Sequence, residues 1–461
     1  MPTQMSPEEF RAAAHRTVDW IADYLRDVRD YPVLPDVQPG ALTALLPKSG
    51  PEQGEPIGAI LEDFQNLILP GITHWNHPRF FGYFSISGSG PGILGEMLAA
   101  ALNVNHMVWK TGPAATELEQ AALGWLRQWL GLPEGFFGII HDTASTASMH
   151  AVIAAREAAR EAGGGEMEEM VLYTSQHANL SVDRAALAAG VDRGNIRHIP
   201  VDNEFRMRCD ALEAAISADL SAGKRPFCVV PTLGTTSSSS LDPLPEIAAI
   251  AQRHKLWLHV DAAYAGPAAI LPEYRYILDG AELADSLVLN PHKWLFTPVD
   301  LSALYTRRPE VFRRALSLQE TPAYLQGSDG AVNLSDYSVN LGRRFRALKL
   351  WFVLRYYGRE GIAEILRGHM RMAREFAGRV EADPRFELAA PVLFSLVCFR
   401  LRGSDEDNRQ LLESVNATGR AFLSGTQLRG NFVLRLAIGN IATTDADIQA
   451  TWDLIRSAAP R

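Results

Sequence analysis

Short apolar runs alternate with segments of helical period between about residues 115 and 300, and this alternation constrains the fold most. The runs are rich in apolar or β-branched residues and cover 136–140, 170–173, 196–200, 227–230, 256–260 and 286–289. Strands that alternate with helices form a mostly parallel sheet that is covered on both faces. The pattern predicts an α/β domain, and ligands in such domains bind at the carboxyl ends of the strands.

Two ionisable residues follow two of these runs. Asp261 directly follows the run 256–260 and lies within the segment 259–266, and Lys293 lies within the segment 289–298. Either residue alone is commonly a solvated side chain at a strand end. Together, in this order, they indicate pyridoxal phosphate (PLP) chemistry, in which a lysine forms a Schiff base and an aspartate holds the pyridinium nitrogen. Ala263 would offer a small, flat surface beneath the ring.

The segment 140–148 is rich in small hydroxyl residues and stands between a predicted strand and a predicted helix. Free N–H groups at the start of a helix form an anion site, so we expect a phosphate to bind at Thr143, Ala144 and Ser145. The alternative is an ordinary N-cap. The sequence contains no GxGxxG or P-loop pattern, which argues against dinucleotides and nucleoside triphosphates.

Composition and charge exclude several other classes of protein. The chain has 461 residues, a net charge of −9 and a pI near 5.8, which gives no electrostatic footprint for nucleic acid. Its three cysteines have no spacing that suits a metal site or a disulfide framework. We expect no metal, no membrane span and no signal peptide, and a cytoplasmic location.

The two ends of the chain differ from its middle. Ser6-Pro7-Glu8-Glu9 reads as a capping box before a helix with an apolar stripe, which packs either on its own domain or on a second subunit. An extended Pro/Gly-rich connector follows over 31–56, and 316–335 lacks periodicity. Helices over 342–357 and 445–458 and strands over 394–401 and 432–438 predict an α+β C-terminal domain.

Several segments give the chain a resemblance to the group II PLP-dependent amino-acid decarboxylases, specifically the aromatic L-amino acid decarboxylase branch. They are 73–84, 116–119 and 341–352, together with the aspartate and lysine motifs. The resemblance implies an α/β, PLP-dependent type I (aspartate aminotransferase-like) fold and a homodimer with shared active sites. It implies an N-terminal helical segment over 1–82 that swaps onto the partner, a large PLP-binding domain over 83–358 and a small α+β domain over 359–461.

The same resemblance assigns roles to individual residues. Lys293 would carry the cofactor and Asp261 would hold its ring nitrogen. Tyr324 would protonate the substrate carbon after carbon dioxide leaves. The remaining cofactor contacts would be Thr143, Ala144, Ser145, Asn179, Thr236, Ala263, Asn290 and His292. The substrate pocket would be formed by Trp75, Tyr83, Phe84, Ser85, Ile86 and Gly342, with Met107 reaching in from the neighbouring subunit.

One departure from the family pattern suggests an alternative function. A gapless alignment places Asn179 where the family has a histidine stacked on the ring, and a shifted register would bring His177 there instead. Asparagine at this position resembles the insect aldehyde synthases of the same family, which consume oxygen, whereas Tyr324 favours ordinary protonation. We expect decarboxylation of a tryptophan-, tyrosine- or DOPA-type amino acid to its amine, with an oxygen-dependent aldehyde synthase as the alternative and a cofactor-binding non-enzyme as a third reading. Gly342 hints at indole substrates.

Overall fold

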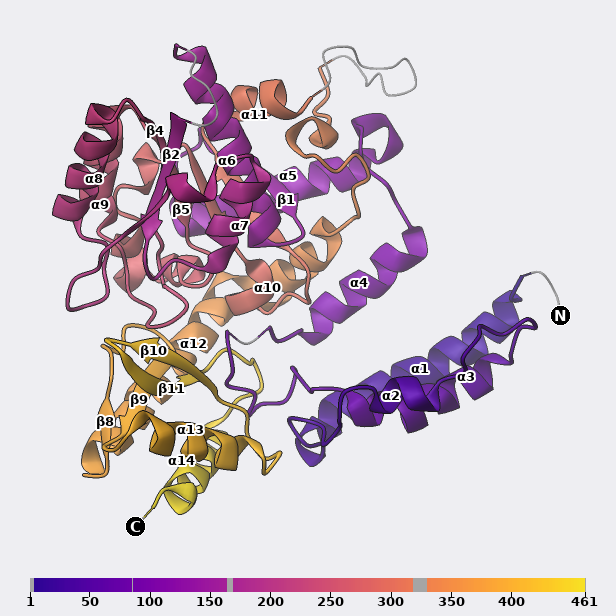
Figure 1. Cartoon of the computed structure of the whole chain (residues 1–461). Coiled ribbons are helices and arrows are strands. Elements are labelled where there is room, and N and C mark those ends of the chain that lie inside the picture. The colour runs from indigo at the N-terminus through magenta and orange to yellow at the C-terminus, as the bar shows by residue number, and fades with distance from the viewer. Residues whose placement is uncertain (1–3, 85, 164–168, 318–329, 461) are drawn as a thin grey trace.

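The structure is a computed structural model, and it describes residues 4–84, 86–163, 169–317 and 330–460 (Figure 1). Its α-helices are α1 Pro7–Asp27, α2 Ala41–Leu45, α3 Ile57–Asp63, α4 Gly90–Leu102, α5 Pro113–Leu130, α6 Ala144–Glu161, α7 Leu180–Ala188, α8 Cys209–Ser221, α9 Leu244–His254, α10 Pro291–Trp294, α11 Pro309–Leu316, α12 Ala347–Ala382, α13 Asp405–Asn416 and α14 Asp445–Ala458. Its strands are β1 Phe137–His141, β2 Met170–Ser175, β3 Ile196–Ile199, β4 Arg225–Val230, β5 Trp257–Asp261, β6 Ser286–Leu289, β7 Ser302–Thr306, β8 Phe386–Leu388, β9 Leu396–Leu401, β10 Ser424–Leu428 and β11 Asn431–Ala437.

The larger sheet has seven strands in the order β1-β7-β6-β5-β4-β2-β3. β3, β2, β4, β5 and β6 are parallel, and β7 is antiparallel to both β6 and β1. The six predicted runs correspond to β1 through β6, so the predicted mostly parallel α/β architecture is confirmed. The sequence pattern did not predict β7, because only the four-residue helix α10 and a loop separate it from β6, with no long crossover helix between them.

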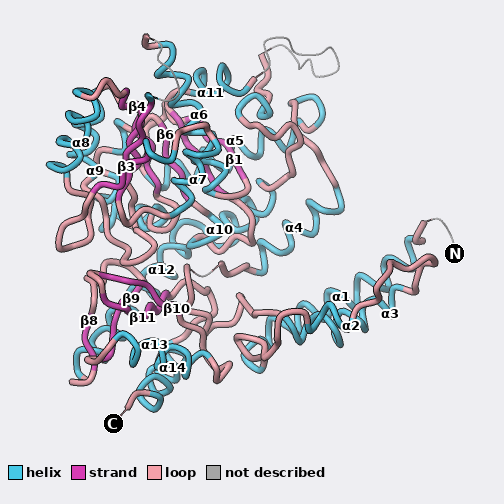
Figure 2. The backbone as a smooth tube through the Cα atoms, in the orientation of Figure 1, coloured by secondary structure: helices cyan, strands magenta, loops and turns pink. Residues whose placement is uncertain are grey.

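Helices cover both faces of this sheet, as the tube view shows (Figure 2). One apolar layer contains side chains of α6, α7 and α11, such as Val152, Val182 and Phe312. The layer on the other face contains side chains of α5, α9 and α12, such as Leu126, Ile247 and Leu350. Because the strands are buried on both faces, the polar groups at their ends are the ones that can form a site.

The C-terminal part forms its own antiparallel sheet, in the order β10-β11-β9-β8, with a separate core that includes side chains of α12, α13 and α14. The predicted helix over 342–357 is partly wrong. Residues 342–346 lie beside Asn105, whose Oδ1 accepts the N–H of Arg343 at 2.9 Å, and α12 begins only at Ala347. Gly358 interrupts α12 with φ +63° and ψ 176°, and helical structure then continues to Ala382.

The N-terminal helices extend away from the two sheets as an elongated arm (Figure 1). Ser6 caps α1 as expected, since its hydroxyl accepts the N–H of Glu9 at 3.1 Å. Phe10, Val18 and Leu25 of the predicted apolar stripe are exposed, and Ala13 is the buried residue of α1. The stripe is therefore exposed over Phe10, Val18 and Leu25, whereas Val28 at its end is buried.

Candidate active site

A cavity of about 200 Å³ lies at the carboxyl ends of the parallel strands. It gathers all ten residues that were expected to contact the cofactor: Thr143, Ala144, Ser145, Asn179, Thr236, Asp261, Ala263, Asn290, His292 and Lys293. Phe84, expected to contact substrate, also lines it. Four further lining residues were not assigned from the sequence, namely Ser181, Thr232, Gly234 and Tyr264. Tyr264 stands three residues after Asp261, and this closeness in the sequence is the feature that could have identified it as a lining residue.

Lys293 and Asp261 are the ionisable pair of this cavity. Asp261 ends β5, and its Oδ1 accepts the N–H of Ala263 at 3.0 Å. Burial raises the pKa of Asp261, and the positive charge of Lys293 opposes that rise. Burial lowers the pKa of Lys293, which lies in α10 after β6, and Asp261 opposes that change. A lysine with a lowered pKa is more often neutral, and only the neutral amine is a nucleophile.

The start of α6 forms a cradle for an anion. Thr143 is the N-cap, and its hydroxyl accepts the N–H of Thr146. The first N–H groups of the helix, which include those of Ala144 and Ser145, have no acceptor within the helix and carry the positive end of its dipole. Ala144 and Ser145 line the same cavity as Lys293 and Asp261. This donor set fits a phosphate group.

His292 and Asn290 add donors to the same cavity. Nδ1 of His292 accepts the N–H of Leu301 at 2.9 Å, so the ring carries its proton on Nε2. Burial and the neighbouring Lys293 lower the pKa of His292 to about 3, which keeps the ring neutral. Oδ1 of Asn290 accepts the hydroxyl of Ser302 at 2.5 Å, which leaves the amide nitrogen as the donor. The hydroxyl of Thr232 is buried without a partner among the described residues.

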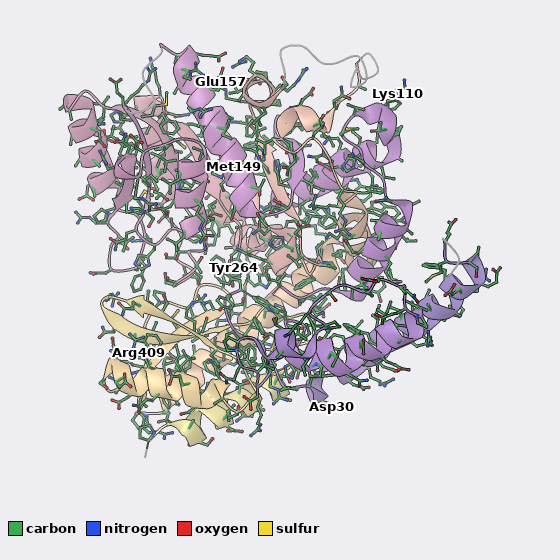
Figure 3. All side chains as sticks on the ribbon, turned by 45° about the vertical axis from the view of Figure 1, so that its right-hand side comes forward. Asp30, Lys110, Met149, Glu157, Tyr264 and Arg409 are labelled. Carbon is green, nitrogen blue, oxygen red and sulfur yellow. The ribbon has the colours of Figure 1, made fainter. Side chains whose placement is uncertain are left out.

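An aromatic stack forms one wall of the cavity. The ring of Phe84 lies 3.6 Å from that of Tyr264 at an interplanar angle of 11°, and Tyr264 stacks in turn on Trp294 at 5.0 Å. Tyr264 is labelled near the centre of the molecule in Figure 3, and its hydroxyl bonds to the hydroxyl of Ser395 at 2.7 Å. The C-terminal domain therefore helps to hold this wall in place.

Tyr83, which precedes Phe84, adopts a left-handed backbone conformation with φ +54°. Two side chains of the C-terminal sheet hold it there. The hydroxyl of Ser424 accepts its N–H at 3.2 Å, and its carbonyl accepts a guanidinium N–H of Arg435 at 3.2 Å. These bonds offset the strain of a non-glycine residue at positive φ, and they direct Phe84 into the cavity.

Asn179, and not His177, lines the cavity. Oδ1 of Asn179 accepts the N–H of Ser181 and caps α7, while Nδ2 donates to the hydroxyl of Thr236, each at 3.0 Å. The ring of His177 lies 5.5 Å from that of Phe205. The side chain presented to the cavity is therefore the amide of Asn179, and the imidazole of His177 is not among the lining residues.

Among the described residues, the others expected to contact substrate do not line this cavity. Trp75 stacks on the exposed Tyr83 at 5.7 Å, and Ile86 is half-buried. The carbonyl of Met107 accepts the N–H of Ser335 at 3.1 Å, and Gly342 is exposed beside Asn105. Ser85 and Tyr324 lie outside the described residues.

Two further observations concern the described part of the chain. No group of three or more histidine, cysteine, aspartate or glutamate side chains there could hold a metal ion. Across the same ranges, no helix has the length and apolar character needed to cross a membrane.

A lysine, an aspartate and an anion cradle at the ends of parallel strands define the class of protein as a PLP-dependent enzyme. Residues 39–402 match the family model described as the pyridoxal-dependent decarboxylase conserved domain. The chain belongs to this family of decarboxylases.

Full-length relatives support this assignment. The chain is 43% identical to tyrosine decarboxylase 4 of Petroselinum crispum, over 99% of this chain and 94% of that one. It is 42% identical to phenylacetaldehyde synthase of Arabidopsis thaliana, over 99% and 96%. A crystal structure of Oryza sativa TDC with PLP and tryptamine superposes with a TM-score of 0.96 at 37% identity, over 99% of each chain.

Proposed function

We propose that this enzyme converts an aromatic L-amino acid of the tryptophan, tyrosine or DOPA type into its amine and carbon dioxide. The observation that carries the proposal is the placement of the Phe84–Tyr264 stack on the same cavity as Lys293 and Asp261. An apolar, aromatic wall favours a flat aromatic side chain over an acidic one. The names of the relatives agree with this substrate class.

Each group of the cavity has a defined task in this reaction. PLP, when bound, supplies an electron sink for the electron pair that the departing carboxylate leaves on the substrate. Lys293 acts as the amine nucleophile that holds the cofactor. Asp261 keeps the pyridine nitrogen protonated. The α6 cradle and His292 bind the phosphate, and we propose that Tyr324 returns a proton to the substrate carbon.

Turnover of a substrate panel tests this proposal. The purified enzyme loaded with PLP is mixed separately with tryptophan, tyrosine, DOPA and glutamate, and the amine and carbon dioxide are quantified. We expect equal amounts of amine and carbon dioxide from at least one aromatic substrate and none from glutamate. A Lys293→Ala variant, as the control, should release neither. Turnover of glutamate alone would refute the aromatic assignment.

A second candidate function rests on Asn179. The amide that it presents to the cavity replaces an imidazole, and phenylacetaldehyde synthase is among the relatives. In that case the same substrates would give aldehyde, ammonia and carbon dioxide, with water consumed and oxygen reduced to hydrogen peroxide. Dissolved oxygen and aldehyde recorded during turnover decide between the two functions, since amine formation at constant oxygen excludes the synthase.

We propose that the enzyme is a cytoplasmic homodimer with shared active sites. The support is the arm of α1 to α3, whose apolar side chains Phe10, Leu45 and Ile60 are exposed. An exposed apolar row of this kind is typical of an interaction surface. We also propose the three units 1–82, 83–358 and 359–461. The separate core of the C-terminal sheet and the break at Gly358 support the second boundary.

A further inference from the structure

A buried carboxylate outside the cavity joins three segments of the chain. Glu119 lies in α5 with its side chain fully buried. Its Oε1 accepts the N–H of Ile140 at 2.8 Å and a guanidinium N–H of Arg343 at 2.6 Å, and its Oε2 accepts Nε2–H of His106 at 3.2 Å. Although burial favours the neutral acid, Arg343 and His106 hold the pKa of Glu119 below its usual value, so the group is a carboxylate.

One side of this cluster reaches the cofactor cradle. Ile140 belongs to β1, which is an edge strand of the large sheet. Glu119 binds the N–H of Ile140 and Arg343 binds its carbonyl at 3.1 Å, so the two side chains occupy hydrogen-bonding positions that a further strand would fill. Thr143, the first residue of the cradle, follows Ile140 by three positions. The end of β1 is therefore fixed by this ion pair.

The other side of the cluster holds the two segments that were expected to meet substrate. The N–H of Arg343 donates to Oδ1 of Asn105 at 2.9 Å, and the carbonyl of Arg343 accepts the N–H of His106 at 3.3 Å. Met107 follows His106, and Gly342 precedes Arg343. Both segments are thus anchored to the same carboxylate that fixes β1.

We propose that Glu119 is a positioning residue whose two sets of hydrogen bonds act on different steps. The bonds to Arg343 and Ile140, here called the cofactor arm of Glu119, hold the phosphate cradle and thereby retain PLP. The bond to His106, here called the substrate arm of Glu119, holds the segment that carries Met107 and thereby sets substrate affinity. The second arm rests on the proposed function, whereas the first depends only on the binding of PLP.

If the role of Glu119 is purely structural, its replacement should have the same effects as replacement of any other buried carboxylate that accepts three hydrogen bonds. Asp219 is such a carboxylate and serves as the matched control. Asp219 accepts the hydroxyl of Tyr173 at 2.8 Å and two N–H groups of Arg197 at 3.0 and 2.5 Å. It is buried like Glu119, but its partners lie on β2 and β3, away from the segments that carry Thr143 and Met107. Neither Asp219 nor Arg197 lines the cavity.

The experiment measures two properties of the holoenzyme variants Glu119→Gln, Arg343→Lys, His106→Phe and Asp219→Asn. The rate of PLP release is followed from the absorbance of bound PLP after dilution, and KM is measured with an aromatic amino acid. We expect Glu119→Gln and Arg343→Lys to release PLP about tenfold faster, because each loses a hydrogen bond to a charged group. We expect His106→Phe to raise KM severalfold with unchanged release.

Asp219→Asn should lower the unfolding temperature and leave both PLP release and KM unchanged. If Glu119→Gln fails to fold, Arg343→Lys still tests the cofactor arm, because lysine keeps the charge but is one bond too short to replace Nη2, the guanidinium nitrogen that donates to both Glu119 and Ile140. Wild-type release in Arg343→Lys, or equal effects of Asp219→Asn and Glu119→Gln, would overturn the proposal. If no aromatic amino acid turns over, the proposed function fails while the release measurements still decide the cofactor arm.

Discussion

At the scale of single residues, the chemistry of the site follows from burial. Lys293 and Asp261 each shift toward the neutral form because water is excluded, and each partly restores the charge of the other. His292 is neutral for the same reason and donates through Nε2. The cavity therefore holds a nucleophilic amine, an acceptor for a ring N–H and neutral donors for phosphate in close proximity.

Replacement of Asp261 by asparagine tests the role of its charge. The amide keeps the shape but cannot keep a pyridine nitrogen protonated, so we expect kcat to fall by about two orders of magnitude or more. PLP should remain bound, because Lys293 is intact. Steady-state kinetics and the absorbance of bound PLP measure the two effects. The control is Asp285→Asn, which removes a half-buried carboxylate that accepts the N–H of Leu258 in the strand that Asp261 ends, and equal losses of kcat in both variants would contradict the role of Asp261.

The residues of the cavity were largely predictable, and the exceptions have a physical reason. Asp261, Asn290 and Lys293 stand at strand ends, where the parallel topology brings them together. Thr232 and Gly234 line the cavity because the chain after β4 continues beside the end of β5, where Thr232 pairs in parallel with Asp261, and that path is not visible in periodicity. Met107 was expected to reach the cavity of a neighbouring subunit, so its absence from the cavity of its own chain does not test that expectation.

At the scale of elements, close helix contacts set the frame around the site. Gly95 of α4 lies so close to α12 that a Cβ atom would stand 2.7 Å from Cα of Lys349. The backbone of α12 cannot move away without disturbing its buried side chains. α12 begins just after residues 342–346, which Glu119 anchors through Arg343, so this contact also supports the segment that we propose to face substrate.

Alanine substitution at Gly95 should therefore destabilise the protein. We expect Gly95→Ala to lower the free energy of unfolding by about 1–3 kcal/mol through overpacking. Gly124→Ala is the matched control, because Gly124 lies within α5 and a Cβ atom there meets nothing within 4 Å. The free energy of unfolding of the control should rise by about 0.5–1 kcal/mol, because alanine is a better helix former than glycine. Urea unfolding measures both changes, and a neutral Gly95→Ala would show that the two helices can separate.

The elements themselves were predicted unevenly. Helix α14 was predicted with its correct bounds because Thr444 and Asp445 mark its start with polar capping residues before an apolar period. The helical pattern after Gly342 was extended too far toward the N-terminus. Arg343 pairs with Asn105 and Glu119 instead of continuing a helix, and such distant partners override local propensity.

At the scale of the whole molecule, buried neutral histidines couple folding to pH. Burial lowers the pKa of His259 and His292 to about 3, and of His150 and His369 to about 4. In the unfolded chain they titrate near the ordinary value of about 6.5. Because the unfolded state then binds more protons, stability is lost as pH falls from about 6.5 toward 4.

We expect the free energy of unfolding to fall by about 1.4 kcal/mol per pH unit for each such histidine over that window. Urea unfolding at pH 7, 6 and 5 measures the slope. His369→Gln removes one titrating group, so its slope should be shallower by about that amount. A slope that is the same in the variant and the wild type would contradict the assignment of a buried neutral His369.

The arm gives a second prediction at this scale. A glutamate at Phe10 places a charge in the exposed apolar row of α1, so we expect Phe10→Glu to weaken the proposed dimer by about tenfold or more in dissociation constant. Analytical ultracentrifugation measures the change. Leu220→Glu is the control, because Leu220 is comparably apolar and exposed but lies on α8. Equal weakening by both variants, or a wild-type monomer, would contradict an arm-mediated dimer.

We propose that Lys293 holds PLP in the cavity between β5, β6 and α6. This can be measured by borohydride reduction of the PLP-loaded enzyme, followed by digestion and mass spectrometry of the peptides. We expect a pyridoxyl group on the peptide that contains Lys293 and none in the reduced Lys293→Ala variant. A pyridoxyl group on a different lysine, or on none, would show that Lys293 does not hold PLP.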